Sequence, residues 1–484
     1  MPGANELALQ TNTPEQLALR ATFGLLQSFD EGRSWSWICE KAIETSGVIA
    51  DPPFGVVEDG SLVLLPPTGG ILTSHDHGCS WAQALDSVTQ QRGADLTVDP
   101  SDPKRLLVLM STTERVDELG YGIIKNAIIE TRDSAHSWRT LATLPSDVEA
   151  ETIEVAKSDP RRMYVSGTLS TDPRMGVLLR SEDGGQSWTR TTMMLPAGTG
   201  SLLISAIHPR DPDRLWLRVP VRGDTLGLFA ARLFVSTDKG KTARMLALTR
   251  TAMLGFALSP DGEKVAYGAP ADGLFVGPSD GSGTFEKRNS VAVRCLRWRV
   301  DGALFACGTE PLDAFSLAIS RDEGRTFEGL YSLKDTCPAT CADANAYASA
   351  CREPWTTSTR VAVGAVANMC TVPWASEGNG PDAGVAREER DAALASDAGP
   401  SGEPPPRTGE SRDATLPQAM LGDAGAKATG TANPPSRASA DGSGCSALPT
   451  DRAPPPLLLL VLSFLILRRA GARQKREREY ANET

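Results

Sequence analysis

Acidic residues and arginines are the side chains of this sequence best suited to act on, or bind, a small molecule. The chain holds 60 Asp and Glu residues, and most glycoside hydrolysis needs only two carboxyl groups that face one cleft. However, no spacing selects such a pair. A serine nucleophile elbow, a phosphate-binding loop and an H-E-x-x-H zinc motif are absent from the sequence. We therefore predict no catalytic residue and no cofactor.

Two histidines, His75 and His77, flank Asp76 at a spacing that suits a shared metal ion. All three fall in a segment that reads as an exposed turn, where solvated side chains are the simpler interpretation. We predict no metal site at these residues.

Four of the nine cysteines lie close together, with the spacing C-x3-C-x9-C-x18-C and no histidine among them. This spacing fits no common zinc pattern, so two disulfides are favoured over a metal site, and disulfides indicate an oxidising compartment. The four residues are Cys337, Cys341, Cys351 and Cys370.

A repeated motif, Ser-x-Asp-x-Gly-x-Ser/Thr-aromatic, indicates the elements that must position any site. Asp can accept hydrogen bonds from its own turn, Gly supplies positive φ, and the closing aromatic starts the next strand. We call these segments the aspartate turns. Their aspartates are Asp30, Asp76, Asp133, Asp183, Asp238 and Asp322, and their closing aromatics are Trp35, Trp81, Trp138, Trp188 and Phe327. The turn that contains Asp133 has Ala135 in place of the Gly, and the turn that contains Asp238 has no closing aromatic residue.

A second repeated element, an Asp-Pro or Asp-Gly turn followed by a β-rich run, precedes several aspartate turns. One unit therefore reads as four antiparallel strands, which is a propeller blade. With a degenerate copy at residues 279–285 the count is seven units over residues 5–335. The sequence predicts an all-β, seven-bladed β-propeller, while six or eight blades also fit the spacing.

The remaining cysteines can be placed on these predicted blades. Cys295 and Cys307 flank a hairpin that turns at Asp301-Gly302, which places them opposite each other, so we expect a disulfide; two buried thiols are the alternative. Cys39 follows the first aspartate turn, and Cys79 lies within the second. We expect a disulfide between them that joins the two neighbouring blades.

Three further segments follow the propeller. Residues 336–374 form a cysteine-rich, disulfide-bonded segment with β-like runs such as residues 361–366. Residues 375–456 contain no aromatic residue and are rich in Ala, Gly, Pro, Ser and Asp, which predicts a disordered stalk. Residues 457–484 combine a short apolar run with a basic cluster, which predicts a short transmembrane helix with the bulk of the chain outside the cytoplasm.

The N-terminal residues show neither a basic nor an apolar signal region. Because the C-terminal segment nevertheless indicates export, we expect a signal peptide encoded upstream of Met1. The net charge of −11 argues against a nucleic-acid partner.

The aspartate turns resemble the Asp-box, or BNR, repeats of sialidases and sortilin-type receptors. The resemblance implies a propeller fold, in which these turns are structural. A sialidase would also require three arginines that clamp a carboxylate and a tyrosine nucleophile activated by Glu. The sequence has only six tyrosines and lacks the Arg-Ile-Pro signature, so sialidase activity is not the favoured reading.

The C-terminal segment is similar to sorting segments of the MYXO-CTERM type. The similarity rests on Gly444, Cys445, the leucine run and the following arginines. It implies membrane targeting and cell-surface or outer-envelope presentation, with processing near Cys445. Taken together, we expect a non-enzymatic surface propeller that binds an unknown protein or carbohydrate; a glycosidase on the same scaffold is the alternative.

Overall fold

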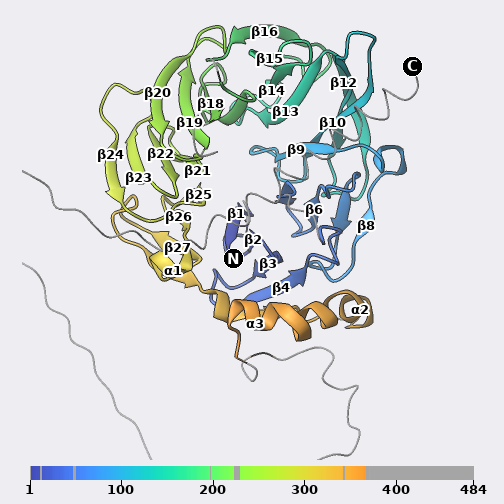
Figure 1. The fold of residues 1–484 in the computed structure, drawn as a ribbon, viewed down its shortest axis with the longest axis vertical. Helices are drawn as coiled ribbons and strands as arrows, with labels where there is room; N and C mark the ends of the chain where they lie inside the picture. The colour runs from blue at the N-terminus through green and yellow to red at the C-terminus, as the bar shows by residue number, and fades with distance from the viewer. Residues whose placement is uncertain are drawn as a thin grey trace, which may run out of the picture. The chain divides into compact units, whose positions relative to one another are not determined.

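The computed structural model describes residues 2–10, 13–46, 51–196, 198–222, 229–341, 344–366 and 370. All of them belong to one compact unit, Met1–Ala386. The described chain forms seven sheets arranged around an axis, each built from four consecutive antiparallel strands, and a later strand adds to the edge of the first sheet (Figure 1). The predicted all-β, seven-bladed propeller is thus confirmed. The predicted stalk (residues 375–456) and transmembrane segment (residues 457–484), with Gly444 and Cys445, lie outside the described residues.

Each blade takes its strands in sequence order, from the axis outward. The strands of blades one to three are β1 (Ala4–Leu9), β2 (Leu17–Ala21), β3 (Gly24–Ser28), β4 (Trp35–Cys39), β5 (Phe54–Val56), β6 (Leu62–Leu64), β7 (Leu72–Ser74), β8 (Ala82–Gln83), β9 (Gly93–Val98), β10 (Leu106–Val116), β11 (Gly122–Thr131) and β12 (Arg139–Leu144). Blade four consists of β13 (Val148–Val155), β14 (Met163–Leu169), β15 (Met175–Ser181) and β16 (Thr189–Met194).

Blades five to seven follow the same order. Their strands are β17 (Leu203–Ile207), β18 (Leu215–Arg222), β19 (Phe229–Ser236), β20 (Arg244–Thr249), β21 (Gly255–Leu258), β22 (Lys264–Ala269), β23 (Gly273–Pro278), β24 (Glu286–Asn289), β25 (Cys295–Trp298), β26 (Leu304–Cys307), β27 (Leu317–Ser320) and β28 (Glu328–Tyr331). Short helical turns occur at η1 (Asp86–Val88), α1 (Glu310–Asp313) and η2 (Leu333–Asp335).

Apolar layers between neighbouring blades form the core. Between blades three and four, Leu107 and Leu109 of β10 pack with Val165 of β14 and Val177 of β15, and all four are fully buried. Burial of one such side chain contributes about 1.5–3 kcal/mol. The innermost strands contact their neighbours around the ring, and β1 of the first blade contacts β25 of the last.

The aspartate turns connect the third and fourth strands of six blades, and they share one hydrogen-bond pattern. In the first, Asp30 Oδ1 accepts from Ser28 Oγ at 2.8 Å and from the Ser34 N–H at 2.9 Å, and Asp30 Oδ2 accepts from Ser34 Oγ at 2.7 Å. The indole of Trp35 donates to the Gly32 carbonyl at 3.0 Å. Asp76, Asp133, Asp183, Asp238 and Asp322 repeat these carboxylate bonds.

Two departures from the motif are accommodated locally. Ala135 keeps the position of the missing glycine with φ of 70°, in the left-handed region that favours glycine. The degenerate copy in blade six is one residue shorter, and there Asp280 accepts from the Ser282 N–H at 2.9 Å.

The cysteine-rich segment forms what we call the C-terminal clasp, consisting of β29 (Thr336–Pro338), α2 (Ala344–Pro354), the π-turn η3 (Trp355–Thr359) and α3 (Arg360–Val363). Strand β29 pairs in parallel with β4, the outermost strand of blade one. The expectation of β-like structure at residues 361–366 is wrong, because Arg360–Val363 continue the helical run that α2 begins. Tertiary context overrides the β-propensity of the valines.

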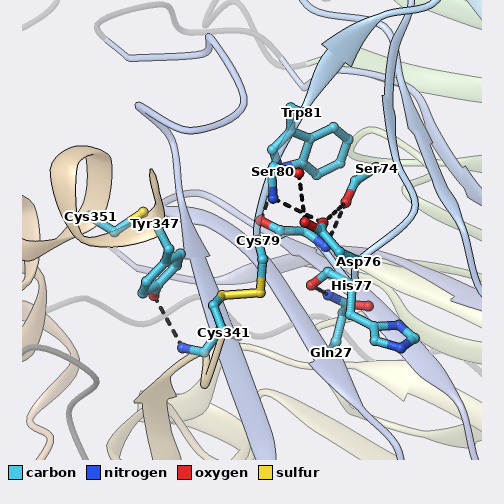
Figure 2. Close-up of a disulfide and its surroundings, with 12 residues drawn as sticks. Gln27, Ser74, Asp76, His77, Cys79, Ser80, Trp81, Cys341, Tyr347 and Cys351 are labelled. Atoms are coloured by element: carbon cyan, nitrogen blue, oxygen red, sulfur yellow. Dashed lines mark hydrogen bonds between the residues drawn. A yellow bond between two sulfur atoms is a disulfide. The ribbon is translucent and has the colours of Figure 1, made fainter. Parts of the chain in front are cut away.

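Disulfides attach the clasp to the first two blades. Cys351 bonds Cys39 at the end of β4, and Cys341 bonds Cys79 within the second aspartate turn (Figure 2). The expected joining of Cys39 with Cys79 is therefore wrong, as is the expectation of two disulfides within the four-cysteine cluster. Only Cys337–Cys370 falls inside the cluster. Both errors have one cause: the clasp returns to the start of the ring and offers a nearer partner to each cysteine.

The Cys295–Cys307 disulfide is present, and its two residues are direct partners in the β25–β26 pairing. This expected pairing is confirmed. Among the residues described, the structure has no helix of the length and apolar character needed to cross a membrane.

Candidate functional site

Two cavities lie on the propeller axis, lined mainly by the innermost strands. One, of about 390 Å³, has aromatic and aliphatic walls that include Phe54 and Trp298. The other, of about 410 Å³, has mostly charged and polar walls. Glu6, Leu96, Glu154 and Arg297 line both cavities, so these four side chains stand where the two cavities adjoin. We call the second one the polar axial cavity.

Four arginines line the polar axial cavity, and they come from three different blades. Arg20 of β2 is neutralised, because it pairs with Glu6 at 2.8 Å. The other three form no ion pair with a carboxylate in the described part of the chain: Arg218 donates to the Met253 carbonyl, Arg297 Nε donates to the Leu7 carbonyl at 3.0 Å, and Arg294 Nε donates to Asn5 Oδ1 at 3.0 Å.

The three arginines differ in burial: Arg218 and Arg294 are half-buried, whereas Arg297 is exposed. Burial lowers the pKa of Arg218, which shows how strongly its surroundings disfavour the charged form. Its Nε is also buried without a hydrogen-bond partner in the described structure. A carboxylate placed among Arg218, Arg294 and Arg297 would satisfy guanidinium groups that protein carbonyls and an amide only partly satisfy.

Four carboxyl groups line the same cavity: Glu6 and Asp51, which both pair with Arg20, and Asp95 of β9 and Glu154 of β13. Burial raises the pKa of Glu154 to about 7, against the opposing charge of Arg297 and a hydrogen bond from Thr97 Oγ1 at 3.2 Å. Burial and the charge of Glu154 raise the pKa of Asp95 well above its usual range, although the Ile153 N–H donates to it at 2.9 Å.

Of the residues that the sequence singled out, Cys295 lines the polar axial cavity, with its sulfur bonded to Cys307, and no residue of the aspartate turns lines either cavity. The carboxylates of the aspartate turns are used by their own turns, and hydrogen bonds from Ser137 and Thr131 hold the pKa of Asp133 at about 2. The cavities also contain no tyrosine among their described lining residues. The tyrosine nucleophile that a sialidase requires is therefore not found at this site.

The sequence did carry one signal for the axial residues that was missed. Asp95, Glu154 and Arg297 are charged residues inside the short strands nearest the axis, flanked by apolar residues such as Leu96, Val155 and Leu296. A charged residue inside an inner strand indicates either that its side chain faces a polar channel or that it forms an ion pair in the interior. What the sequence could not show is that β9, β13 and β25 place these charges together.

His75 and His77 point to different neighbours. His77 is exposed, and its ring lies 4.8 Å from that of Phe29. His75 instead stacks on His136 of the next aspartate turn, with ring centroids 4.3 Å apart. The pair that the sequence suggested is thus replaced by a different pair across two blades.

The chain matches no protein-family model and no curated protein sequence. Among solved structures it is similar to an ancestral GH74 enzyme, at 13% identity and a TM-score of 0.49 over 68% of this chain and 46% of that one. It is also similar to Kuenenia stuttgartiensis hydrazine synthase, at 12% identity and a TM-score of 0.45 over 67% of this chain and 97% of that one.

A third similar structure is the GH74 xyloglucanase from Xanthomonas campestris, at 15% identity and a TM-score of 0.27 over 67% of this chain and 72% of that one. The chain spans less than half the length of the ancestral GH74 enzyme. At these identities the similarities concern the propeller fold alone.

Proposed function

We propose that this protein is a non-enzymatic binding propeller whose polar axial cavity takes an acidic saccharide, a sugar unit that carries a carboxylate. One observation carries the proposal: Arg218, Arg294 and Arg297 line one cavity, and none of them is ion-paired within the described residues. Binding sites typically combine apolar and aromatic walls with a few polar groups, and Phe256 of the same cavity supplies an aromatic wall.

The proposal includes presentation outside the cytoplasm, through the C-terminal segment at residues 457–484. Four disulfides among the described residues support it, because disulfides persist in oxidising compartments. Protease treatment of intact cells tests it: the propeller should be degraded while a cytoplasmic marker survives. Protection of the propeller until the cells are lysed would contradict surface presentation.

Binding is tested by calorimetry of the full-length protein with uronic-acid oligosaccharides, using the neutral oligosaccharides of the same linkage as controls. Arg297→Gln should weaken binding by about 10–100-fold, the loss expected for one charge-assisted hydrogen bond of about 1.5–3 kcal/mol. Arg174→Ala is the matched control, because Arg174 is exposed, lies outside the cavity lining and pairs with neighbouring Asp172. Equal binding of acidic and neutral sugars would refute the proposal.

A glycosidase is the second candidate, and the raised pKa of Glu154 favours it, since a general acid must hold its proton near neutral pH. Asp95 would be the second carboxyl group. Release of reducing ends from a panel of acidic and neutral polysaccharides is the assay. If wild type releases sugar and Glu154→Gln does not, the protein is an enzyme and the non-enzymatic proposal is wrong.

A further inference from the structure

Three side chains from three separate turns meet where blades two and three adjoin. Asp59 lies in the turn between β5 and β6, His75 in the aspartate turn between β7 and β8, and His136 in the aspartate turn between β11 and β12. One ligand atom from each residue lies within 4.8 Å of the others, and all three residues are exposed. We call this group the histidine pair site.

Ser61 orients two members of the site. Its backbone N–H donates to Asp59 Oδ1 at 2.9 Å, which leaves Oδ2 free to face His136. Its hydroxyl lies 2.8 Å from His75 Nδ1, which leaves Nε2 of that ring available. Ser61 is itself buried. Outer residues that fix a ligating imidazole and carboxylate in this way are a regular feature of metal sites.

The two histidines are also held by rigid backbone. His75 lies between Ser74 and Asp76, whose side chains are hydrogen-bonded at 2.8 Å. His136 lies within the turn that Asp133 organises by accepting from the Ser137 N–H at 2.8 Å. The rings therefore project from turns fixed on both sides, and they stack with an interplanar angle of 7°.

We propose that Asp59, His75 and His136 bind a divalent transition-metal ion, with Zn²⁺ as the reference ion. Two imidazoles and a carboxylate suit zinc, nickel or copper, whereas magnesium and calcium prefer oxygen ligands alone. Ligands of a tetrahedral zinc ion lie roughly 3.4 Å apart. His136 Nε2 and Asp59 Oδ2, at 3.2 Å, already match this spacing, and the ligand atoms of all three residues lie within 4.8 Å of one another.

The ion would keep at least one open position, because the described chain offers three ligands and the site faces solvent. Water or a donor from a partner molecule completes the coordination. The alternative arrangement is a hydrogen bond between His136 and Asp59 beside the stacked ring of His75, with no metal. The two differ in one measurable property, which is metal affinity that depends on both histidines.

The test is calorimetric titration of Zn²⁺ into the full-length protein carrying Cys445→Ser, since Cys445 is the one cysteine outside the four disulfides. We expect one ion per chain. His75→Ala and His136→Ala should each weaken binding by on the order of 100-fold, and Ser61→Ala by about 10-fold. His77→Ala is the matched control: it removes an imidazole two residues from His75 and should leave the affinity unchanged.

A spectroscopic readout separates this site from loss of folding. With one equivalent of Cu²⁺, the electron paramagnetic resonance spectrum should show coupling to two imidazole nitrogens in wild type and in His77→Ala, and to one in His136→Ala. Circular dichroism checks that each variant is folded. Zinc affinity that is equal in wild type, His75→Ala and His136→Ala would overturn the proposal, as would an equal loss in His77→Ala.

Discussion

The hydroxyl group of Tyr347 donates to the backbone carbonyl of Trp37 at 2.5 Å, across 310 residues of sequence. Tyr347 belongs to helix α2 of the clasp, and Trp37 belongs to β4 of the first blade. The same hydroxyl accepts from the Ala339 N–H at 3.1 Å, and the ring of Trp355 lies 5.5 Å from that of Trp37. The ring is thus closed at its periphery, by a segment that follows the last blade.

Tyr347→Phe should destabilise the propeller by about 1–2 kcal/mol, because it removes a fully buried hydrogen-bonding group from two backbone partners. Urea unfolding followed by tryptophan fluorescence measures the change. Tyr121→Phe is the control, since Tyr121 is exposed on the β10–β11 hairpin. An equal, small effect of both substitutions would show that the Tyr347 bond does not stabilise ring closure.

The two long disulfides should act cooperatively. The loops that they close span 312 and 262 residues, and the shorter loop lies inside the longer one. When one of the two bonds is already formed, the other closes a loop of only about 50 residues (312 − 262). Loop-closure entropy then assigns about 4 kcal/mol to removing either bond while the other remains, and more than twice that to removing both. Unfolding of C39S/C351S, C79S/C341S and the fourfold variant measures these values.

Additive losses in these variants would contradict the loop argument. The control is C295S/C307S, whose 12-residue loop within one blade gives about 3 kcal/mol in the same model. That bond lies within one blade and does not help to close the ring of blades. The loss of stability on removing it should therefore add to the loss on removing either long disulfide.

Acid should destabilise the aspartate turns. The folded pKa of Asp133 is about 2, below its ordinary value of 3.8, so its contribution is fully present above pH 4 and is lost as the pH falls through about 2. Asp133→Asn should therefore lower the melting temperature at pH 5 and have less effect at pH 2. Thermal unfolding at both values tests this, and an undiminished effect at pH 2 would contradict it.

Glu154 should have the opposite pH dependence. Its folded pKa, about 7, lies above its ordinary value of 4.5, so the folded state binds more protons between these values and stability falls as the pH rises from about 4.5 to 7. Glu154→Gln should stabilise the protein by about 1–3 kcal/mol at pH 8 relative to wild type and by far less at pH 4. Chemical unfolding at both pH values checks this difference, and a pH-independent effect would contradict it.

The fold was predictable because its signal is local. Each aspartate turn needs only eight consecutive residues to define it, so six copies reveal the blades without any knowledge of long-range contacts. The Cys295–Cys307 bond was predictable for the same reason, since one hairpin sets its register. The helices of the clasp were not predicted, because the valine-rich residues 361–366 have a high intrinsic strand propensity. Their packing in the folded protein makes the first of them helical.

The sites were not predictable, because their residues meet through ring geometry. Arg218 and Arg297 come from blades five and seven, and nothing between them in the sequence marks the shared cavity. His75 and His136 belong to neighbouring copies of one motif, at different positions within it. Comparing the same turn position across blades could not have paired them.

Closure by the clasp also sets an order for biosynthesis. A nascent chain leaves the ribosome with β1 to β4 first, yet the partners of Cys39 and Cys79 are translated only after the seventh blade. Until β29 emerges, β4 is an uncovered edge, open to pairing with another chain. Both long disulfides can likewise form only after all seven blades have been synthesised.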